Sequence, residues 1–223
     1  NRINFLERIM RSNREKGFVP ALGYSYDWLL RGYDTLLALS RLGWTFKREV
    51  VRAAALSGQE RIADIGCGTG VLLREAVISH PGLSIVGVDP DERILRIARR
   101  SMPARASQRV TLQREYAHGL SFEDRSFDVC FSTLTFHHLS LSQKRQAAAE
   151  MHRVLDQDGR AIIADFRSVR FPFFSKFFIF ENAEYLRQNF QGAVREALVS
   201  AGFSRIEEIR RPFSLVSIFI AWK

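Results

Sequence analysis

The sequence predicts an α/β protein in which a doubly wound, mostly parallel sheet carries helices on both faces. From Arg61 onwards, short apolar segments alternate with segments of helical periodicity, which is typical of parallel strands joined by helices. A glycine-rich turn over residues 64–70 joins the first of these strands to its helix. The chain has 223 residues, enough for one domain with a substantial core and a small appendage.

The N-terminal part differs from the rest because its apolar residues recur only at helical spacing. We therefore expect a helical cap over residues 1–55, followed by the main domain over residues 56–223. The cap contains Tyr24, Tyr26 and Tyr33. These rings could close over a binding site and exclude water, or they could pack as an ordinary amphipathic surface, and the sequence leaves both readings open.

The main domain divides into strands and helices in a regular order. The expected strands are 61–65, 83–89, 110–113, 127–132, 160–165, 205–209 and 214–222, and the expected helices are 71–79, 91–100, 142–155 and 194–200. The dipeptide Asp158-Gly159 predicts a turn just before the fifth strand.

A phenylalanine-rich stretch follows the fifth strand, with basic residues interspersed between Phe166 and Phe180. It predicts a lid inserted at about residues 166–190. Such a lid could contact an apolar acceptor, touch a membrane interface peripherally, pack onto the domain, or form a homodimer contact.

The composition indicates which partners and which cellular compartment to expect. A net charge of +9 and a pI near 10.1 favour anionic partners or a solvated basic surface, although the arginines form no dense block. The two cysteines, Cys67 and Cys130, lack metal-ligand spacing, so we expect no metal site. The sequence shows neither a secretory signal nor an apolar run of about 18 residues, and we expect a cytoplasmic protein without a membrane span.

The glycine turn Asp64-Ile65-Gly66-Cys67-Gly68-Thr69-Gly70 has the spacing G-x-G-x-G and begins with an acid. Glycine allows a backbone with positive φ to approach a ligand closely. The carboxylate of Asp64 suits an ammonium group and would repel a pyrophosphate. The turn therefore favours a cationic ligand group over the dinucleotides that bind a G-x-G-x-x-G turn.

A second acid, Asp89, ends the next strand, where a carboxylate can accept hydrogen bonds from both hydroxyls of a ribose. The segment Asp89-Pro90-Asp91-Glu92 also has the pattern of a helix start. Asp89 could thus serve as a ribose ligand or as a helix cap, with Asp91 closer to the capping position.

With these two acids in place, the chain resembles the class I S-adenosylmethionine-dependent methyltransferases. It is most similar to their small-molecule group, which includes the ubiquinone/menaquinone biosynthesis C-methyltransferases. The matching stretches are 61–70, 85–95, 120–139 and 150–165. The resemblance implies a Rossmann-like, seven-stranded sheet with an antiparallel last strand. It also implies S-adenosyl-L-methionine as cofactor and a small, lipophilic or aromatic methyl acceptor.

The resemblance further implies which residues bind the cofactor. The turn would line its methionine end, Asp89 would hold the ribose, Pro90 would pack on the adenine, and the end of the fourth strand would pass beside the sulfonium. The implied cofactor residues are Asp64, Gly66, Cys67, Gly68, Gly70, Asp89, Pro90, Tyr116, Ala117, Phe131 and Ser132. The chain departs from its relatives at Tyr116, which stands where many of them carry an acid near the adenine amino group.

His137 and His138 follow the fourth strand and are the candidate catalytic bases. Methyl transfer from a sulfonium mainly requires alignment, and a base helps only when the acceptor must lose a proton. Either histidine could instead cap a helix or pack structurally. Two further functions remain open: an RNA methyltransferase, which the net charge of +9 favours, and a non-catalytic cofactor-binding scaffold.

Overall fold

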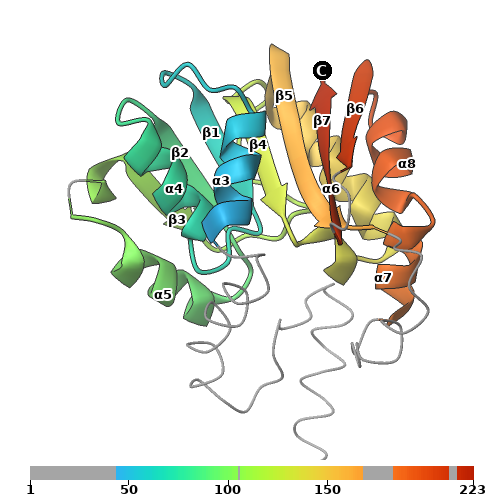
Figure 1. Cartoon of the computed structure of the whole chain (residues 1–223), viewed down its shortest axis with the longest axis horizontal. Helices are drawn as coiled ribbons and strands as arrows, with labels where there is room; N and C mark the ends of the chain where they lie inside the picture. The colour runs from blue at the N-terminus through green and yellow to red at the C-terminus, as the bar shows by residue number, and fades with distance from the viewer. Residues whose placement is uncertain (1–43, 105, 168–182, 211–214) are drawn as a thin grey trace, which may run out of the picture.

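The computed structural model describes residues 44–104, 106–167, 183–210 and 215–223. Their seven strands form one sheet in the order β3-β2-β1-β4-β5-β7-β6 (Figure 1). Strand β7 runs antiparallel to both of its neighbours, and the other pairs are parallel. The strands are β1 Arg61–Ile65, β2 Ser84–Val88, β3 Val110–Gln113, β4 Phe127–Thr133, β5 Leu155–Phe166, β6 Arg205–Arg210 and β7 Val216–Trp222. This arrangement confirms the predicted fold class.

The helices form a layer on each face of the sheet. In Figure 1, α3 and α4 lie in front of the sheet, whereas α6 and α8 lie behind it. The helices are α3 Trp44–Ala53, α4 Val71–Ser79, α5 Glu92–Ser101, α6 Leu141–Val154, α7 Ala183–Phe190 and α8 Ala193–Ser200, with short 3-10 turns η1 Ser107–Arg109 and η2 Phe136–His138.

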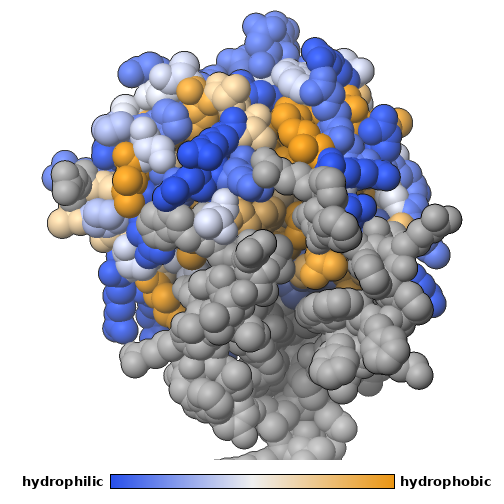
Figure 2. Space-filling model, in the orientation of Figure 1, coloured by the Kyte–Doolittle hydropathy of each residue, from blue (hydrophilic) through white to orange (hydrophobic). Residues whose placement is uncertain are grey.

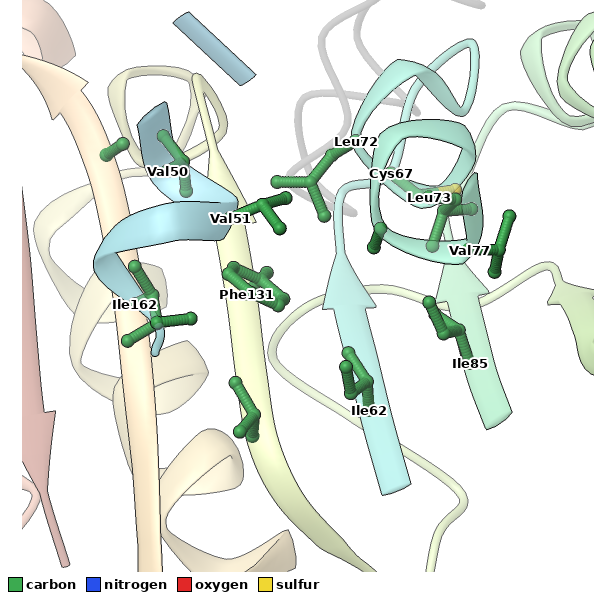
Figure 3. Close-up of a cluster of buried hydrophobic side chains, with 14 of the residues drawn as sticks. Val50, Val51, Ile62, Cys67, Leu72, Leu73, Val77, Ile85, Phe131 and Ile162 are labelled. Atoms are coloured by element: carbon green, nitrogen blue, oxygen red, sulfur yellow. The ribbon is translucent and has the colours of Figure 1, made fainter. Parts of the chain in front are cut away.

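Each face of the sheet has its own apolar core. In front, Val51 of α3 and Leu73 of α4 pack over Ile62 and Phe131 of the central strands (Figure 3). Behind, residues of α6 and α8 pack against the alternate side chains of the same strands. Because successive side chains of a strand point to opposite faces, the pattern of each strand decides which side chains reach the site and which fill the core.

Local sequence signals explain where two helices start. Asp91 caps α5, and its side chain accepts a hydrogen bond from the backbone of Arg93. Ser140 and Gln143 form a reciprocal capping box at the start of α6. The expectation that Asp91 lies closer to the capping position than Asp89 is therefore confirmed.

The fifth strand differs from the prediction. It begins at Leu155, so Asp158 and Gly159 lie inside the strand and the expected turn there is wrong. The register shifts between Phe127 and Val129 of the partner strand, and this irregularity accommodates the polar start of β5.

Two predicted features fall largely outside the described residues: the part of the cap before residue 44, including its tyrosines, and the phenylalanine-rich stretch from 168 to 182. The last helix of the expected cap, α3, packs into the front core through Val50, Val51 and Phe46. The boundary at residue 55 stays a prediction. Within the described ranges, no helix is both long and apolar enough to cross a membrane.

Candidate functional site

The candidate site lies at the carboxyl ends of β1, β2 and β4. The sheet order places β2 on one side of β1 and β4 on the other, so the connections leaving β1 and β4 diverge at this point. In open α/β sheets, ligands bind at such a point, outside the carboxyl ends of the strands. Both predicted acids and the glycine turn belong to these strand ends.

The glycine turn is fixed against the end of β2. The backbone N–H groups of Gly66 and Cys67 both donate to the carbonyl of Val88, at 2.8 and 2.9 Å. Gly66 has φ of +76°, and a Cβ there would lie 2.3 Å from Oγ1 of Thr135. Only glycine fits at this position, because the conformation and the close approach of Thr135 both exclude a side chain.

The turn and the second acid face one another. The N–H of Gly68 donates to Oδ2 of Asp89 at 3.1 Å, and the N–H of Asp91 donates to Oδ1 at 2.9 Å. These bonds fix the carboxylate while each oxygen keeps lone-pair capacity for another donor. Burial raises the pKa of Asp89 to about 6. A Cβ added at Gly68 would meet no atom of the described residues within 4 Å, so none of those residues covers the backbone beside this carboxylate.

Asp64 is a fully buried carboxylate, and neither of its oxygens has a hydrogen-bond partner among the described residues. Burial raises its pKa to about 7, and the nearby Asp89 carboxylate adds to this, while the charge of Lys47 opposes it. A buried carboxylate without a partner is costly, and a cationic ligand group would relieve that cost. The site therefore fits a ligand with an ammonium group next to a ribose.

Three predicted cofactor residues have other surroundings. The side chains of Cys67 and Phe131 lie in the front core, Cys67 beside Leu73 and Phe131 beside Ile62 (Figure 3). Gly70 lies where α4 approaches α5, and a Cβ there would come within 3.1 Å of the Cβ of Ala98. A cofactor could reach Cys67 and Phe131 through their backbone only.

The remaining predicted cofactor residues lie around the same strand ends. Ser132 is buried and donates from Oγ to the carbonyl of Ile65 at 2.9 Å, which ties β4 to the start of the turn. Pro90 follows Asp89 directly and is half-buried. Tyr116 and Ala117 follow β3, with the Tyr116 ring 5.5 Å from that of His118. Their roles in binding remain predictions.

The two histidines differ sharply in their environments. Nδ1 of His137 lies 2.9 Å from Oδ1 of the buried Asp165, at the end of β5. Burial would raise the pKa of Asp165, but the His137 imidazole and hydrogen bonds hold it below its usual range. For His138, burial and the neighbouring His137 lower the pKa to about 3. The His137–Asp165 pair is thus the better-oriented candidate for proton transfer.

A buried lysine completes this region. Nζ of Lys144, in α6, donates to the carbonyl of Leu139 and, at 3.2 Å, to that of Tyr185 in α7. Burial lowers its pKa to about 8, and the charge of Asp165 partly opposes that shift. Lys144 therefore links η2, where the histidines lie, to the helix that follows the phenylalanine-rich stretch.

Sequence reasoning missed three side chains that define these surroundings: Lys47, Asp165 and Lys144. The position of Asp165 at the end of a predicted strand was a usable signal, because parallel strands bring their carboxyl ends together. Lys47 and Lys144 gave none, since each lies on a helix whose packing is set by tertiary contacts.

Comparison with known proteins supports this description. Residues 62–159 match the family model described as a methyltransferase domain. A curated ubiquinone/menaquinone biosynthesis C-methyltransferase of Citrifermentans bemidjiense is 32% identical over 152 residues, which cover 66% of this chain and 64% of that protein. The chain thus spans a little under two thirds of the length of this relative.

Solved structures share the fold. A SAM-dependent methyltransferase from Aquifex aeolicus gives a TM-score of 0.64 at 18% identity, covering 79% of this chain and 88% of that one. Phosphoethanolamine N-methyltransferase 2 of Haemonchus contortus, in complex with S-adenosyl-L-methionine, gives a TM-score of 0.66 at 20% identity, covering 82% of this chain and 53% of that one. Over the matched region, the chain is thus similar in sequence to the ubiquinone/menaquinone biosynthesis C-methyltransferases, and its fold is the one found in SAM-dependent methyltransferases.

Proposed function

We propose that the chain binds S-adenosyl-L-methionine at the carboxyl ends of β1 and β2 and transfers its methyl group to a ring carbon of a small, lipophilic quinol. The observation that carries the cofactor assignment is the contact between the N–H of Gly68 and the carboxylate of Asp89, beside the unpartnered carboxylate of Asp64. The quinol assignment rests on the names of the similar C-methyltransferases.

Each residue of the site has a defined part in binding. Asp89 accepts hydrogen bonds from the ribose hydroxyls through the lone pairs that its two hydrogen bonds from backbone N–H groups do not use. Asp64 accepts hydrogen bonds from the ammonium group. Gly68 lets the backbone border the ligand without a side chain between them. When bound, S-adenosyl-L-methionine supplies a methyl group activated by the sulfonium, so the protein has mainly to orient and to exclude water.

Methylation at a ring carbon also requires that carbon to lose a proton. We assign the accepting role to His137, because the Asp165 carboxylate fixes its Nδ1 and stabilises the imidazolium that forms. His138, with a pKa of about 3, is a poor base at neutral pH. The pair is the same kind of oriented base that other enzymes build from histidine and aspartate.

The cofactor assignment is tested by calorimetry with S-adenosylmethionine and S-adenosylhomocysteine. We expect Asp89→Ala to weaken both at least tenfold, since a charge-assisted hydrogen bond contributes about 1.5–3 kcal/mol and tenfold corresponds to about 1.4 kcal/mol. Asp128→Ala is the matched control, because that carboxylate pairs with Arg61 at the opposite end of the sheet. An unchanged affinity of Asp89→Ala would refute the ribose role.

The transfer itself is tested with methyl-labelled cofactor and a short-chain demethylated naphthoquinol, by following label into the organic phase. We expect label on a ring carbon with the wild type and at least tenfold less label with Asp89→Ala at subsaturating cofactor. Tight cofactor binding without transfer to quinols or to other small phenolic acceptors would favour a scaffold protein instead.

A further inference from the structure

A buried lysine bonds to the end of η2, the 3-10 turn that carries both candidate histidines. Lys144 of α6 is completely buried, and its ammonium group donates to the carbonyl of Leu139, directly after η2, and to that of Tyr185 in α7. Its Nζ also lies 5.8 Å from the centre of the Tyr185 ring. These partners are neutral, so they fix the ammonium group in place and leave its charge to be compensated elsewhere.

Asp165 supplies the negative charge that compensates this ammonium group. The carboxylate is buried at the end of β5, and its charge raises the pKa of Lys144 against the larger effect of burial, which leaves that pKa at about 8. The same carboxylate accepts from the backbone N–H of His137, and its Oδ1 lies 2.9 Å from Nδ1 of the imidazole. One buried carboxylate thus interacts with two groups that can carry a positive charge.

Asp165 favours a positive charge on each basic group beside it. If it acted alone, it would favour protonation of His137 in the free enzyme, and an imidazolium cannot accept a proton from the acceptor. A charged Lys144 offsets the carboxylate and repels an imidazolium, so it favours the neutral form of His137. The pKa of Lys144, about 8, lies above the ordinary value of about 6.5 for histidine, so the lysine keeps its charge where an imidazole titrates.

We propose that Lys144 is a positioning residue for the base: its buried positive charge compensates Asp165 and thereby keeps His137 neutral and able to accept a proton at neutral pH. This inference rests on the proposed function, in which His137 takes the proton from the ring carbon of the acceptor. Lys144 acts through Asp165 and does not itself touch the reacting atoms.

The other titratable groups beside η2 carry little charge or are exposed. His138, whose ring centre lies 3.9 Å from that of His137, has a pKa of about 3 and stays neutral at neutral pH. The described part of α7, which packs against η2, has three titratable side chains: Glu184, Tyr185 and Arg187. The glutamate and the arginine are exposed, so water and salt screen their charges. Asp165 and Lys144 are therefore the buried charges that control the protonation of His137.

The test follows the titration of His137 by NMR of the imidazole nitrogens, in protein labelled with nitrogen-15 histidine, from pH 5.5 to 8.5. We expect a neutral imidazole at pH 7 in the wild type. Lys144→Met removes the charge and the hydrogen bonds, whereas Lys144→Gln removes the charge and keeps N–H donors. Both should raise the midpoint of the His137 titration by about one pH unit, because they remove a neighbouring positive charge.

Arg145→Met is the matched control, because it removes a positive charge from the next position of the same helix. That side chain is half exposed and pairs with Glu196 of α8. An exposed charge is screened by solvent, so the midpoint should stay within about 0.3 pH unit of the wild-type value. A purely structural role of Lys144 would leave the midpoint unchanged in Lys144→Gln, which keeps N–H donors at the same place in the chain.

Kinetics with the short-chain naphthoquinol connect this titration to catalysis. In Lys144→Met, the acidic limb of the kcat profile should move to higher pH by about the same one unit, with the KM for the cofactor within about threefold of the wild type. A shifted titration with an unshifted kcat profile would overturn the positioning role, because His137 would not be the base.

Three further results would overturn the proposal: an unchanged midpoint in both uncharged lysine variants, an equal shift in Arg145→Met, or an imidazolium at pH 7 in the wild type. The last result needs no variant, so it decides the question even if the lysine variants do not fold. The titration uses neither cofactor nor acceptor. A lack of methyl transfer to the quinol would therefore refute the proposed acceptor separately from the charge relation among these three residues.

Discussion

At the scale of single residues, the site depends on carboxylates whose ionisation is costly. Asp64 has no hydrogen-bond partner in the described structure, and its pKa is raised to about 7, while Asp89 keeps two backbone donors and a pKa of about 6. The difference follows from hydrogen bonding to the charged form, which favours ionisation. Binding of the ligand would therefore change the ionisation of Asp64 more than that of Asp89.

This difference predicts how cofactor binding depends on pH. Asp64 must be ionised to hold an ammonium, so below about pH 7 the free protein must release a proton on binding. The affinity for S-adenosylmethionine should therefore rise with pH, by up to about tenfold per unit, and level off above about pH 7. Lys47 and Asp89 are the charges that act on this carboxyl group.

The control ligand for this measurement is 5′-methylthioadenosine, which has the ribose but no ammonium. Its affinity should follow Asp89 only and level off near pH 6. Calorimetry from pH 5.5 to 8.5 measures both ligands. Identical pH profiles for the two would show that Asp64 does not hold the ammonium.

The histidines give a second prediction at this scale. A base contributes about 10²- to 10⁴-fold to a rate, and His137 alone is fixed by a carboxylate. With a quinol acceptor, His137→Asn should lower kcat at least 100-fold and leave cofactor affinity within about threefold. His138→Gln should change kcat less than about threefold, because a group with a pKa of about 3 takes up little charge at neutral pH.

Steady-state kinetics with thermal unfolding of both variants separates chemistry from folding. A loss in His138→Gln as large as that in His137→Asn would contradict the assignment. If His137→Asn is largely unfolded at the assay temperature, so that unfolding accounts for its lost activity, the pair with Asp165 only holds η2 against β5.

At the scale of elements, the three glycines of the turn have different structural roles. Gly66 makes room for Thr135, Gly68 has no described atom near its Cβ position, and Gly70 lets α4 approach Ala98 of α5. Their spacing signals a nucleotide-binding turn, but only the packing shows which glycine faces a ligand. All three have positive φ, so conformation alone does not distinguish them.

Substitution by alanine should reveal these duties. Gly70→Ala adds an overpacking cost to the strain of positive φ, and we expect it to lower the free energy of unfolding by about 2–4 kcal/mol. Gly68→Ala should cost only about 1–2 kcal/mol from strain, but weaken S-adenosylhomocysteine binding more than tenfold. Urea unfolding and calorimetry measure the two effects, and equal stability losses with equal binding losses would count against the division.

The same scale shows what the sequence could predict. Periodicity placed β1, α4 and β3 at their observed bounds, and most other predicted elements close to theirs, because strand–helix alternation is a local property. The start of β5 was wrong, since the strand already pairs with β4 at Leu155, and Asp158-Gly159 lie in the irregular stretch between that pair and the next one at Arg160. The core positions of Cys67 and Phe131 depend on which face each residue takes in the assembled sheet, and motif spacing does not contain that information.

At the scale of the whole molecule, the question is what a net charge of +9 does. Many arginines of the described surface already face acids: Arg61 pairs with Asp128 and Asp156, Arg99 with Glu92, and Arg210 with Glu208. On the face shown in Figure 2, hydrophilic side chains cover most of the coloured surface, with apolar patches between them. The paired arginines of the described surface thus lie on several separate elements and form no single patch.

A dispersed charge of this kind predicts weak binding to RNA that depends steeply on salt. Each phosphate contact releases counterions, so the affinity for RNA falls as ionic strength rises. A surface without a dedicated RNA site has no other source of affinity, so it releases RNA once salt removes this electrostatic contribution. We expect mixed RNA to be retained at about 50 mM salt and released by about 200 mM, with cofactor affinity unchanged across that range. Filter binding at several salt concentrations measures retention. If one RNA stayed bound at the higher salt and accepted labelled methyl groups, the basic surface would be a substrate site, and an RNA acceptor would replace the quinol.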